Sequence, residues 1–270
     1  MYTKIERGAY YEKGGKTMQT LSFVNQKGGV GKTTSCLNVG AGLSRAGKRV
    51  LLVDADPQGN LTISAGVKLG DDTPTVYDVL KGSVDINAAI VPSDYDLLPA
   101  DIMLSGADIE LSSVPGREMI LKEAIGQLKT AYDYVLIDCP PSLSVITLMA
   151  LTASSSVIVP VQAHYLALNG IAQLRDTIEL VRRRMNPALE IGGVIVTQYD
   201  HRRLIDREVL ESLTAAFPGK VFQTTISNSV ALVEAPSYGK DIFKYKPNSK
   251  PAAQYEAIVG EILKGDKDNG

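Results

Sequence analysis

A glycine-rich segment at residues 27–34 is the strongest chemical signal in the sequence. It reads K-G-G-V-G-K-T-T, follows an apolar run at residues 20–24 and precedes a pattern of helical period. A loop between a strand and a helix turns successive backbone N–H groups toward a phosphate, and glycine lets the backbone approach closely. In such a loop Lys32 reaches the β- and γ-phosphates and the Thr33 hydroxyl ligates Mg²⁺. The sequence therefore predicts a nucleotide site formed by Lys27, Gly28, Gly29, Val30, Gly31, Lys32, Thr33 and Thr34.

The segment departs from the usual phosphate-loop pattern at its first position. The pattern G-x-x-x-x-G-K-[ST] requires a glycine at position 26, where this chain has Gln26, and a second lysine, Lys27, follows. The alternative interpretation is a glycine-rich turn with solvated lysines. The strand and helix patterns on either side favour the phosphate loop.

Three carboxylates stand at the ends of apolar, strand-like runs and are the candidates for chemistry beside the phosphate loop. They are Asp54, Asp56 and Asp138. Because Mg²⁺ prefers oxygen ligands and keeps several waters, one or two carboxylates beside a phosphate loop are enough to hold it. The alternative for each is a polar residue that caps a turn before a nearby proline. We predict that Thr33, Asp138 and Asp54 form the metal site.

Strand-like and helix-like patterns alternate along the chain and must position these residues. Expected strands cover residues 21–25, 50–54, 95–99, 134–138, 156–161, 193–197 and 220–224. Expected helices cover residues 32–46, 117–129, 145–153, 168–185, 205–216 and 252–263. Nearly continuous apolar strands are typical of a parallel sheet that is covered by helices. We therefore predict an α/β fold of the P-loop NTPase kind, a doubly wound and mostly parallel sheet with helices on both faces and the site at the carboxyl ends of its strands.

The deviant loop resembles the Walker A motif of the ParA/MinD superfamily of P-loop ATPases. Three further blocks strengthen the resemblance, V-D-A-D-P-Q-G-N at residues 53–60, L-I-D-C-P-P-S at 136–142 and E-A-P-S at 234–237. Their order and spacing are similar to those of the ParA/Soj branch over residues 18–264. Any one block can be accidental, whereas four in order are specific. The resemblance implies an ATPase with ATP and Mg²⁺ as cofactors.

The resemblance also implies catalytic roles for Lys27, Asp56 and Lys32. Lys32 contacts the phosphates of its own nucleotide, and Asp56 activates the attacking water. In the ATP-bound homodimer of this superfamily, the lysine that matches Lys27 reaches phosphate oxygens in the other subunit. Gly28 has to stay small because the subunits meet there. The alternative for Lys27 is a contact with its own nucleotide alone.

Binding of non-specific DNA is the next property that the resemblance implies. ATP dimers of ParA proteins bind DNA through basic residues of the C-terminal half, and the candidates here are Arg202, Arg203 and Arg207. Two arginines of the family pattern are missing, because Asn228 and Ala231 stand in their places. Fewer phosphate contacts weaken binding and flatten its salt dependence.

Two functions therefore stay open. The first is an ATP-dependent dimerising switch that binds non-specific DNA, positions or segregates a chromosome, plasmid or other cargo, and hydrolyses ATP slowly until a ParB/Spo0J-like partner stimulates it. The second is an orphan relative that positions a protein cluster with weak or no DNA binding.

Composition narrows the class of protein. With 270 residues, a net charge of −2 and 44% hydrophobic residues, the chain suits one globular domain and not a wholly basic protein that coats nucleic acid. Its two cysteines, Cys36 and Cys139, suit neither a disulfide framework nor a CxxC metal site. We expect a cytoplasmic, nucleoid-associated protein without a membrane partner. Residues 1–17 are expected to be a disordered extension, 18–265 the ATPase domain and 266–270 a flexible tail.

Three other classes of protein fit the sequence less well. A MinD-like membrane ATPase requires a basic amphipathic C-terminal helix, whereas residues 254–270 carry more acidic than basic side chains. An iron–sulfur reductase requires two cysteines per subunit at a dimer axis, and Cys36 is poorly placed for that in the helix after the loop. An ATP-dependent ligase or synthetase requires a substrate pocket, for which the sequence offers no carboxylate or histidine cluster.

Overall fold

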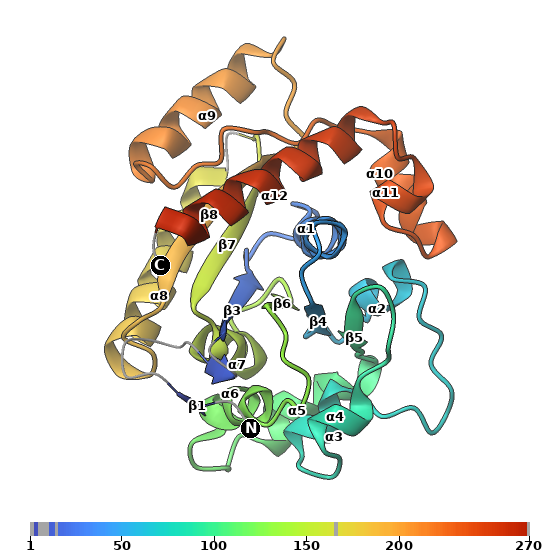
Figure 1. The fold of residues 1–270 in the computed structure, drawn as a ribbon. Helices are drawn as coiled ribbons and strands as arrows, with labels where there is room; N and C mark the ends of the chain where they lie inside the picture. The colour runs from blue at the N-terminus through green and yellow to red at the C-terminus, as the bar shows by residue number, and fades with distance from the viewer. Residues whose placement is uncertain (1–2, 5–10, 14–15, 165–166, 269–270) are drawn as a thin grey trace.

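A parallel sheet of six strands forms the centre of the molecule (Figure 1). The computed structural model describes residues 3–4, 11–13, 16–164 and 167–268. The strands lie in the order β8, β7, β3, β6, β4, β5, and every neighbouring pair is parallel. Their bounds are Lys16–Phe23 for β3, Val50–Asp54 for β4, Asp96–Leu98 for β5, Tyr134–Asp138 for β6, Ser156–Gln162 for β7 and Glu190–Thr197 for β8.

Helices cover both faces of this sheet, as Figure 1 shows. Because successive side chains of a strand point to opposite faces, Leu51 and Val53 of β4 join one apolar core and Leu52 joins the other. The first core includes α6, α7 and α8, and the second includes α1 and α12. The bounds are Lys32–Arg45 for α1, Ile120–Gly126 for α6, Val145–Ala153 for α7, Ala167–Arg184 for α8 and Lys250–Asp268 for α12. The predicted α/β fold with helices on both faces is confirmed.

Further helices, most of them short, lie in the connections between these elements. The 13-residue helix α9 (Leu204–Ala216) follows β8. The others have four or five residues and are α2 (Asn60–Ser64), α3 (Val76–Leu80), α4 (Ile86–Ala89), α5 (Ala107–Glu110), α10 (Val230–Glu234) and α11 (Ile242–Tyr245). Turns of 3₁₀ helix lie at Ile102–Gly106, Arg117–Met119 and Ala235–Tyr238. Elements this short show no apolar period, which is why the sequence did not predict them.

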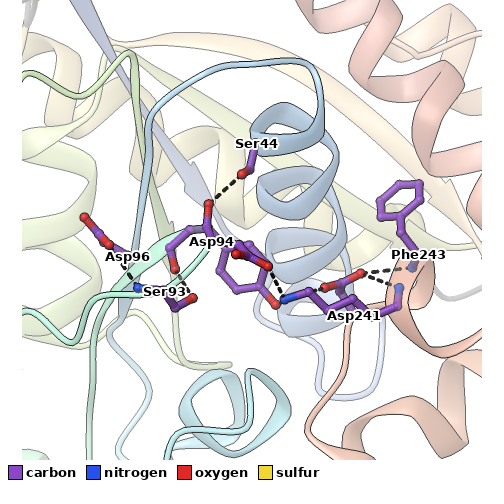
Figure 2. A network of polar contacts seen from close by, with 8 residues as sticks. Ser44, Ser93, Asp94, Asp96, Asp241 and Phe243 are labelled. Atoms are coloured by element: carbon purple, nitrogen blue, oxygen red, sulfur yellow. Dashed lines mark hydrogen bonds and ion pairs between the residues drawn. The ribbon is translucent and has the colours of Figure 1, made fainter.

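A polar network joins the β5 edge of the sheet to α1 and α11 (Figure 2). The carboxylate of Asp241, the N-cap of α11, accepts two backbone N–H bonds from the first turn of that helix. The buried Tyr95 hydroxyl donates to the same carboxylate at 3.2 Å. Lys244 pairs with Asp94 at 2.9 Å, and the Asp94 carbonyl accepts a bond from Ser44 of α1. These contacts hold the C-terminal helices beside the phosphate-loop helix.

One expected strand is absent from the described sheet. Residues 220–224 contribute a single bridge, Val194 with Val221, beyond β8. The backbone N–H groups of Gln223 and Thr224 instead donate to the Glu261 carboxylate of α12. A side chain therefore takes the place of a strand partner, so the prediction of a strand at 220–224 is wrong. The expected helix at 117–129 is also shorter, because a 3₁₀ turn precedes α6 and the helix ends at Gly126.

The two ends of the chain carry regular structure in their described parts. Thr3–Lys4 (β1) and Tyr11–Lys13 (β2) pair as antiparallel strands, and β2 pairs with the start of β3. Residues 1–2, 5–10 and 14–15 of the expected disordered extension lie outside the described residues. At the other end α12 continues to Asp268, and residues 269–270 of the expected tail lie outside the described part.

Candidate nucleotide site

The phosphate loop connects the end of β3 to the start of α1. Gly29 and Gly31 have φ angles of 73° and 85°, a left-handed conformation that residues with a side chain rarely adopt. Gly31 is the N-cap of α1, and this helix has no side-chain cap and no acidic residue in its first turn. Its first N–H groups and the positive end of its dipole are therefore available to an anion.

Lys32 lies within the site and not on the surface. Its side chain is buried, and Nζ donates to the backbone carbonyl of Lys27 at 3.3 Å across the loop. Burial lowers the pKa of Lys32, whereas the nearby Asp138, Cys139 and Asp56 act in the opposite direction. A buried ammonium group among carboxylates is suited to bind phosphate oxygens.

Asp138 carries a buried carboxylate at the carboxyl end of β6, beside Thr33 and Lys32. It is fully buried at the end of β6, and neither oxygen accepts a hydrogen bond of normal geometry from the described residues. Burial raises its pKa well above the ordinary value, and Asp54 adds to the rise, while the Thr33 hydroxyl and Lys32 oppose it. A buried carboxylate without a partner is costly unless it binds a cation. The residues present therefore fit Mg²⁺, with Asp138 and Thr33 as the groups that would hold it.

Asp54 lies beside Asp138 in the sheet, since β4 and β6 pair these two residues. Its carboxylate already accepts three hydrogen bonds, from Thr62 N at 2.8 Å, Thr62 Oγ1 at 2.7 Å and Asp56 N at 3.2 Å. Burial raises the pKa of Asp54 to about 6, although these bonds lower it. The bonds fix the start of α2 and the loop before it. Asp54 therefore positions the loop after β4, and direct metal ligation by Asp54 stays a prediction.

Asp56 begins the turn that follows β4. It is buried, and its Oδ1 accepts the Gln58 N–H at 3.0 Å while its carbonyl accepts the Gly59 N–H at 2.9 Å. The turn presents the side chain on the same edge of the sheet as Lys32, whose pKa it influences. This position is compatible with orienting a water near the γ-phosphate, and the role of Asp56 stays a prediction.

Lys27 and Gly28 form the exposed side of the loop. The Lys27 side chain is exposed, and its Nζ donates to Gln162 Oε1 at 3.3 Å. A Cβ atom added at Gly28 would meet nothing within 4 Å in this chain. The surface at these two residues is thus open to another molecule.

Three further residues contact the site, and the motifs did not identify them. Thr197 Oγ1 donates to the Val30 carbonyl at 2.8 Å, Gln198 Nε2 donates to the Gly29 carbonyl at 2.7 Å, and Thr62 binds Asp54. A signal for the first two was present, because polar residues at the carboxyl end of an expected strand lie at the same sheet edge as the loop. Thr62 lies in a helix too short to be predicted.

The three candidate DNA-binding arginines gather at the start of α9. All are exposed, but Arg202 is bound by Asp200 through Nε at 3.0 Å and Nη2 at 2.8 Å. Arg203 Nε lies 4.0 Å from the same carboxylate. Of the two positions where the family arginines are missing, Asn228 is exposed and Ala231 is buried.

Other kinds of site find little support in the part of the chain that the structure describes. No group of three or more His, Cys, Asp or Glu side chains is arranged to hold a metal there, so Mg²⁺ would need phosphate oxygens and waters as further ligands. No described helix is both long and apolar enough to cross a membrane. Cys36 and Cys139 are both fully buried, unlike cysteines that would share a cluster with a second subunit.

Comparison with protein families and relatives gives a consistent result. A family model described as an AAA domain matches residues 18–191. The sporulation initiation inhibitor protein Soj of Bacillus subtilis is 46% identical over 245 residues, which are 90% of this chain and 97% of that protein. The chromosome partitioning protein ParA of Caulobacter vibrioides is 41% identical over 256 residues, 93% of this chain and 96% of that protein.

Solved structures of similar fold were also found. A crystal structure described as cobyrinic acid a,c-diamide synthase from Mycobacterium smegmatis, with bound ADP and magnesium, has a TM-score of 0.82 and 39% identity. The alignment covers 94% of this chain and 97% of that one. A second structure of that protein holds an ATP analogue and magnesium, with a TM-score of 0.81 and 40% identity.

Proposed function

The chain belongs to the ParA/Soj family of chromosome-partitioning ATPases, and on that premise we propose that it is an ATP-dependent dimerising switch. In the ATP state it binds non-specific DNA, and through repeated cycles it positions or segregates a chromosome, plasmid or other cargo. The observation that carries the proposal is the exposed Lys27 beside Gly28, where the chain's own atoms leave the phosphate loop open.

The chain is an ATPase with ATP and Mg²⁺ as cofactors. Bound Mg²⁺ supplies charge neutralisation at the phosphates. The N–H groups at the start of α1 and the Lys32 ammonium bind and orient the phosphate oxygens. Thr33 and the unpaired carboxylate of Asp138 would hold the cation. Asp56 would orient the attacking water, and a single carboxylate without a stronger base suits slow turnover.

The position of Lys27 supports dimerisation. Its long, exposed side chain binds only Gln162 at 3.3 Å among the contacts described, a weak surface bond that can exchange for a phosphate. A partner subunit can approach Gly28 because no side chain stands there. Lys27 then adds positive charge to the nucleotide of the other subunit, and hydrolysis weakens the link between the subunits.

DNA binding would use Arg202, Arg203 and Arg207 at the start of α9, twice per dimer. Doubling the phosphate contacts makes the dimer bind far more tightly than the monomer. A ParB/Spo0J-like protein would stimulate hydrolysis and so release the DNA. We place the protein in the cytoplasm, in association with the nucleoid.

The proposal is tested by binding to non-specific duplex DNA with ATP, with ADP and without nucleotide, across a salt series. We expect binding only with ATP, retained by Asp56→Ala and lost by Arg202→Ala. A protein that dimerises with ATP and binds no DNA would favour the alternative, in which the missing arginines leave a switch that positions a protein cluster.

A synthase is the second candidate, because the solved structures at 39–40% identity are described as cobyrinic acid a,c-diamide synthase. A groove of about 460 Å³ lies beside the Asp56 turn, between α2 and the segment after β5. Its lining is largely apolar and includes Ile63, Val67 and Ile102. ATP turnover that cobyrinic acid accelerates more than DNA plus a partner protein would favour the synthase.

A further inference from the structure

Two consecutive carbonyl groups of the phosphate loop are bound by side chains at the end of β8. Thr197 Oγ1 donates to the Val30 carbonyl at 2.8 Å, and Gln198 Nε2 donates to the Gly29 carbonyl at 2.7 Å. We propose that Thr197 and Gln198 are positioning residues for nucleotide binding, which hold the loop so that its N–H groups face the phosphates. The inference rests on ATP as the ligand of the loop and not on dimerisation or DNA binding.

The geometry of the peptide bond carries this argument. In a planar trans peptide the C=O and the following N–H point in opposite directions. When Gln198 holds the Gly29 carbonyl on the β8 side, the Val30 N–H must point the other way. Thr197 has the same effect on the Gly31 N–H through the Val30 carbonyl. Both N–H groups are thereby turned away from β8 before any nucleotide arrives, which removes part of the ordering cost of binding.

The backbone conformation of Gln198 indicates that neighbouring contacts hold this residue in place. Gln198 has a φ of 53° and is the only residue other than glycine with a positive φ in the described ranges. Such a conformation is strained for a residue with a long side chain and persists only where neighbouring contacts hold it. Thr197 itself is buried, so its hydroxyl has a defined position against the loop.

The orientation of the Gln198 amide is fixed from its other end. Its Oε1 accepts a bond from Gln162 Nε2 at 2.9 Å, which leaves Nε2 to face the Gly29 carbonyl. Gln162 Oε1 in turn accepts the bond from Lys27 Nζ. The ends of β7 and β8 therefore bind the loop at three points, Lys27, Gly29 and Val30, and the amide pair of Gln162 and Gln198 connects the first two.

The test is ATP and ADP affinity measured by calorimetry for Thr197→Val and Thr197→Ser. Valine has nearly the volume of threonine but lacks the hydroxyl, whereas serine keeps it. We expect Thr197→Val to weaken both nucleotides about tenfold, corresponding to about 1.4 kcal/mol, and Thr197→Ser to bind within about twofold of wild type. Without nucleotide, the valine variant should melt at a lower temperature than the serine variant, because the buried Val30 carbonyl loses its donor, so both affinities are measured at a temperature where each variant is folded. In turnover, KM should rise in the valine variant while kcat changes little, because the contact acts on bound substrate and transition state alike.

Gln198→Asn provides the second test. Asparagine tolerates the left-handed conformation, but its shorter amide does not reach the Gly29 carbonyl. We expect it to weaken ATP binding without lowering the melting temperature of the nucleotide-free protein. If wild type binds ATP and both Thr197→Val and Gln198→Asn bind it equally well, the positioning role is contradicted. Wild type that fails to bind ATP would overturn the ATP switch itself and this inference with it.

Discussion

Asp200 and Arg202 form a surface ion pair in which the carboxylate receives both Nε and Nη2 of the guanidinium, at 3.0 and 2.8 Å. The Arg202 backbone N–H donates to the same group at 3.0 Å. The arginine that the family resemblance selects for DNA binding is therefore already paired within its own turn. DNA phosphate has to compete with this carboxylate for Arg202.

Removing the competing charge should strengthen DNA binding. We predict that Asp200→Asn binds non-specific duplex about threefold more tightly in the ATP state, with a steeper salt dependence. Fluorescence anisotropy across a salt series measures both quantities. The matched control is Arg202→Ala, in which the further change Asp200→Asn should not restore binding. Weaker binding by Asp200→Asn would mean that the carboxylate orients Arg202 for DNA and does not compete for it.

Lowering the pH from 8 to 6 will not break the ion pair between Asp200 and Arg202. The bonds from Arg202 hold the pKa of Asp200 far below its ordinary value, so the carboxylate stays ionised in any mildly acidic buffer. A gain in DNA affinity between pH 8 and pH 6 would therefore have to come from other groups. The Asp200→Asn variant provides the comparison, since its pH dependence should match that of wild type.

Asp138→Asn should stabilise the nucleotide-free protein while damaging its function. The substitution replaces a buried, unpaired carboxylate with a neutral group of the same size. We expect the melting temperature without nucleotide to rise by about 2–4 °C and the Mg²⁺ dependence of ATP binding to be lost. Calorimetry with and without Mg²⁺ measures the second effect. Unchanged Mg²⁺ dependence would show that Asp138 does not hold the cation.

The carboxylates of Asp54 and Asp138 predict how the free energy of unfolding depends on pH. The folded-state pKa of Asp54 is about 6, against an ordinary value of 3.8, and that of Asp138 is also raised. The folded state then binds more protons than the unfolded state between these values, so both groups make the free energy of unfolding fall as the pH rises from 4 toward 6. Chemical denaturation without nucleotide should show this fall, and Asp138→Asn should show a shallower one. Equal slopes would contradict the raised pKa of Asp138.

Thr62 should be important for stability although no motif contains it. Its backbone N–H and hydroxyl both bind Asp54, and the hydroxyl oxygen accepts the Ala100 N–H at 3.0 Å. Thr62→Val keeps the backbone N–H bond to Asp54 but removes the hydroxyl, so Asp54 loses one of its three bonds and the Ala100 N–H loses its acceptor. We expect a loss of about 1–3 kcal/mol in the free energy of unfolding. Thr62→Ser should recover most of it. A valine variant as stable as wild type would show that these bonds contribute no net stability.

Strands and the phosphate loop could be predicted from the sequence where the local residue pattern agrees with the overall fold. The strands that carry Asp54 and Asp138 are continuous apolar runs. The loop adopts a left-handed conformation at positions 29 and 31, and both positions hold glycine, the residue type that adopts this conformation most readily. The two strands, β4 and β6, therefore begin and end at the expected residues, whereas β3 begins five residues before its expected start at residue 21.

The remaining features depend on contacts between distant segments, and a linear pattern does not contain them. The segment after Val221 forms no regular strand beside β8, because Glu261, in a helix near the end of the chain, takes the N–H groups of Gln223 and Thr224. Gln198 is an ordinary polar residue in the sequence, and only the fold brings it to the Gly29 carbonyl. The pairing of Arg202 with Asp200 is local, but a sequence does not show which side chains will meet on a surface.

The most direct test of ATP-dependent dimerisation is to measure the mass of the ATP-bound protein by light scattering. A variant that hydrolyses ATP slowly keeps the nucleotide intact during the measurement. Asp56→Ala with ATP and Mg²⁺ should have twice the mass of one chain, and the same protein with ADP should be a monomer. Adding Lys27→Ala or Gly28→Val should give monomers that still bind ATP; a Cβ at Gly28 meets no atom of this chain, so it obstructs only a partner. A dimer that survives loss of Lys27, or a monomer throughout despite bound ATP, would contradict the proposed switch.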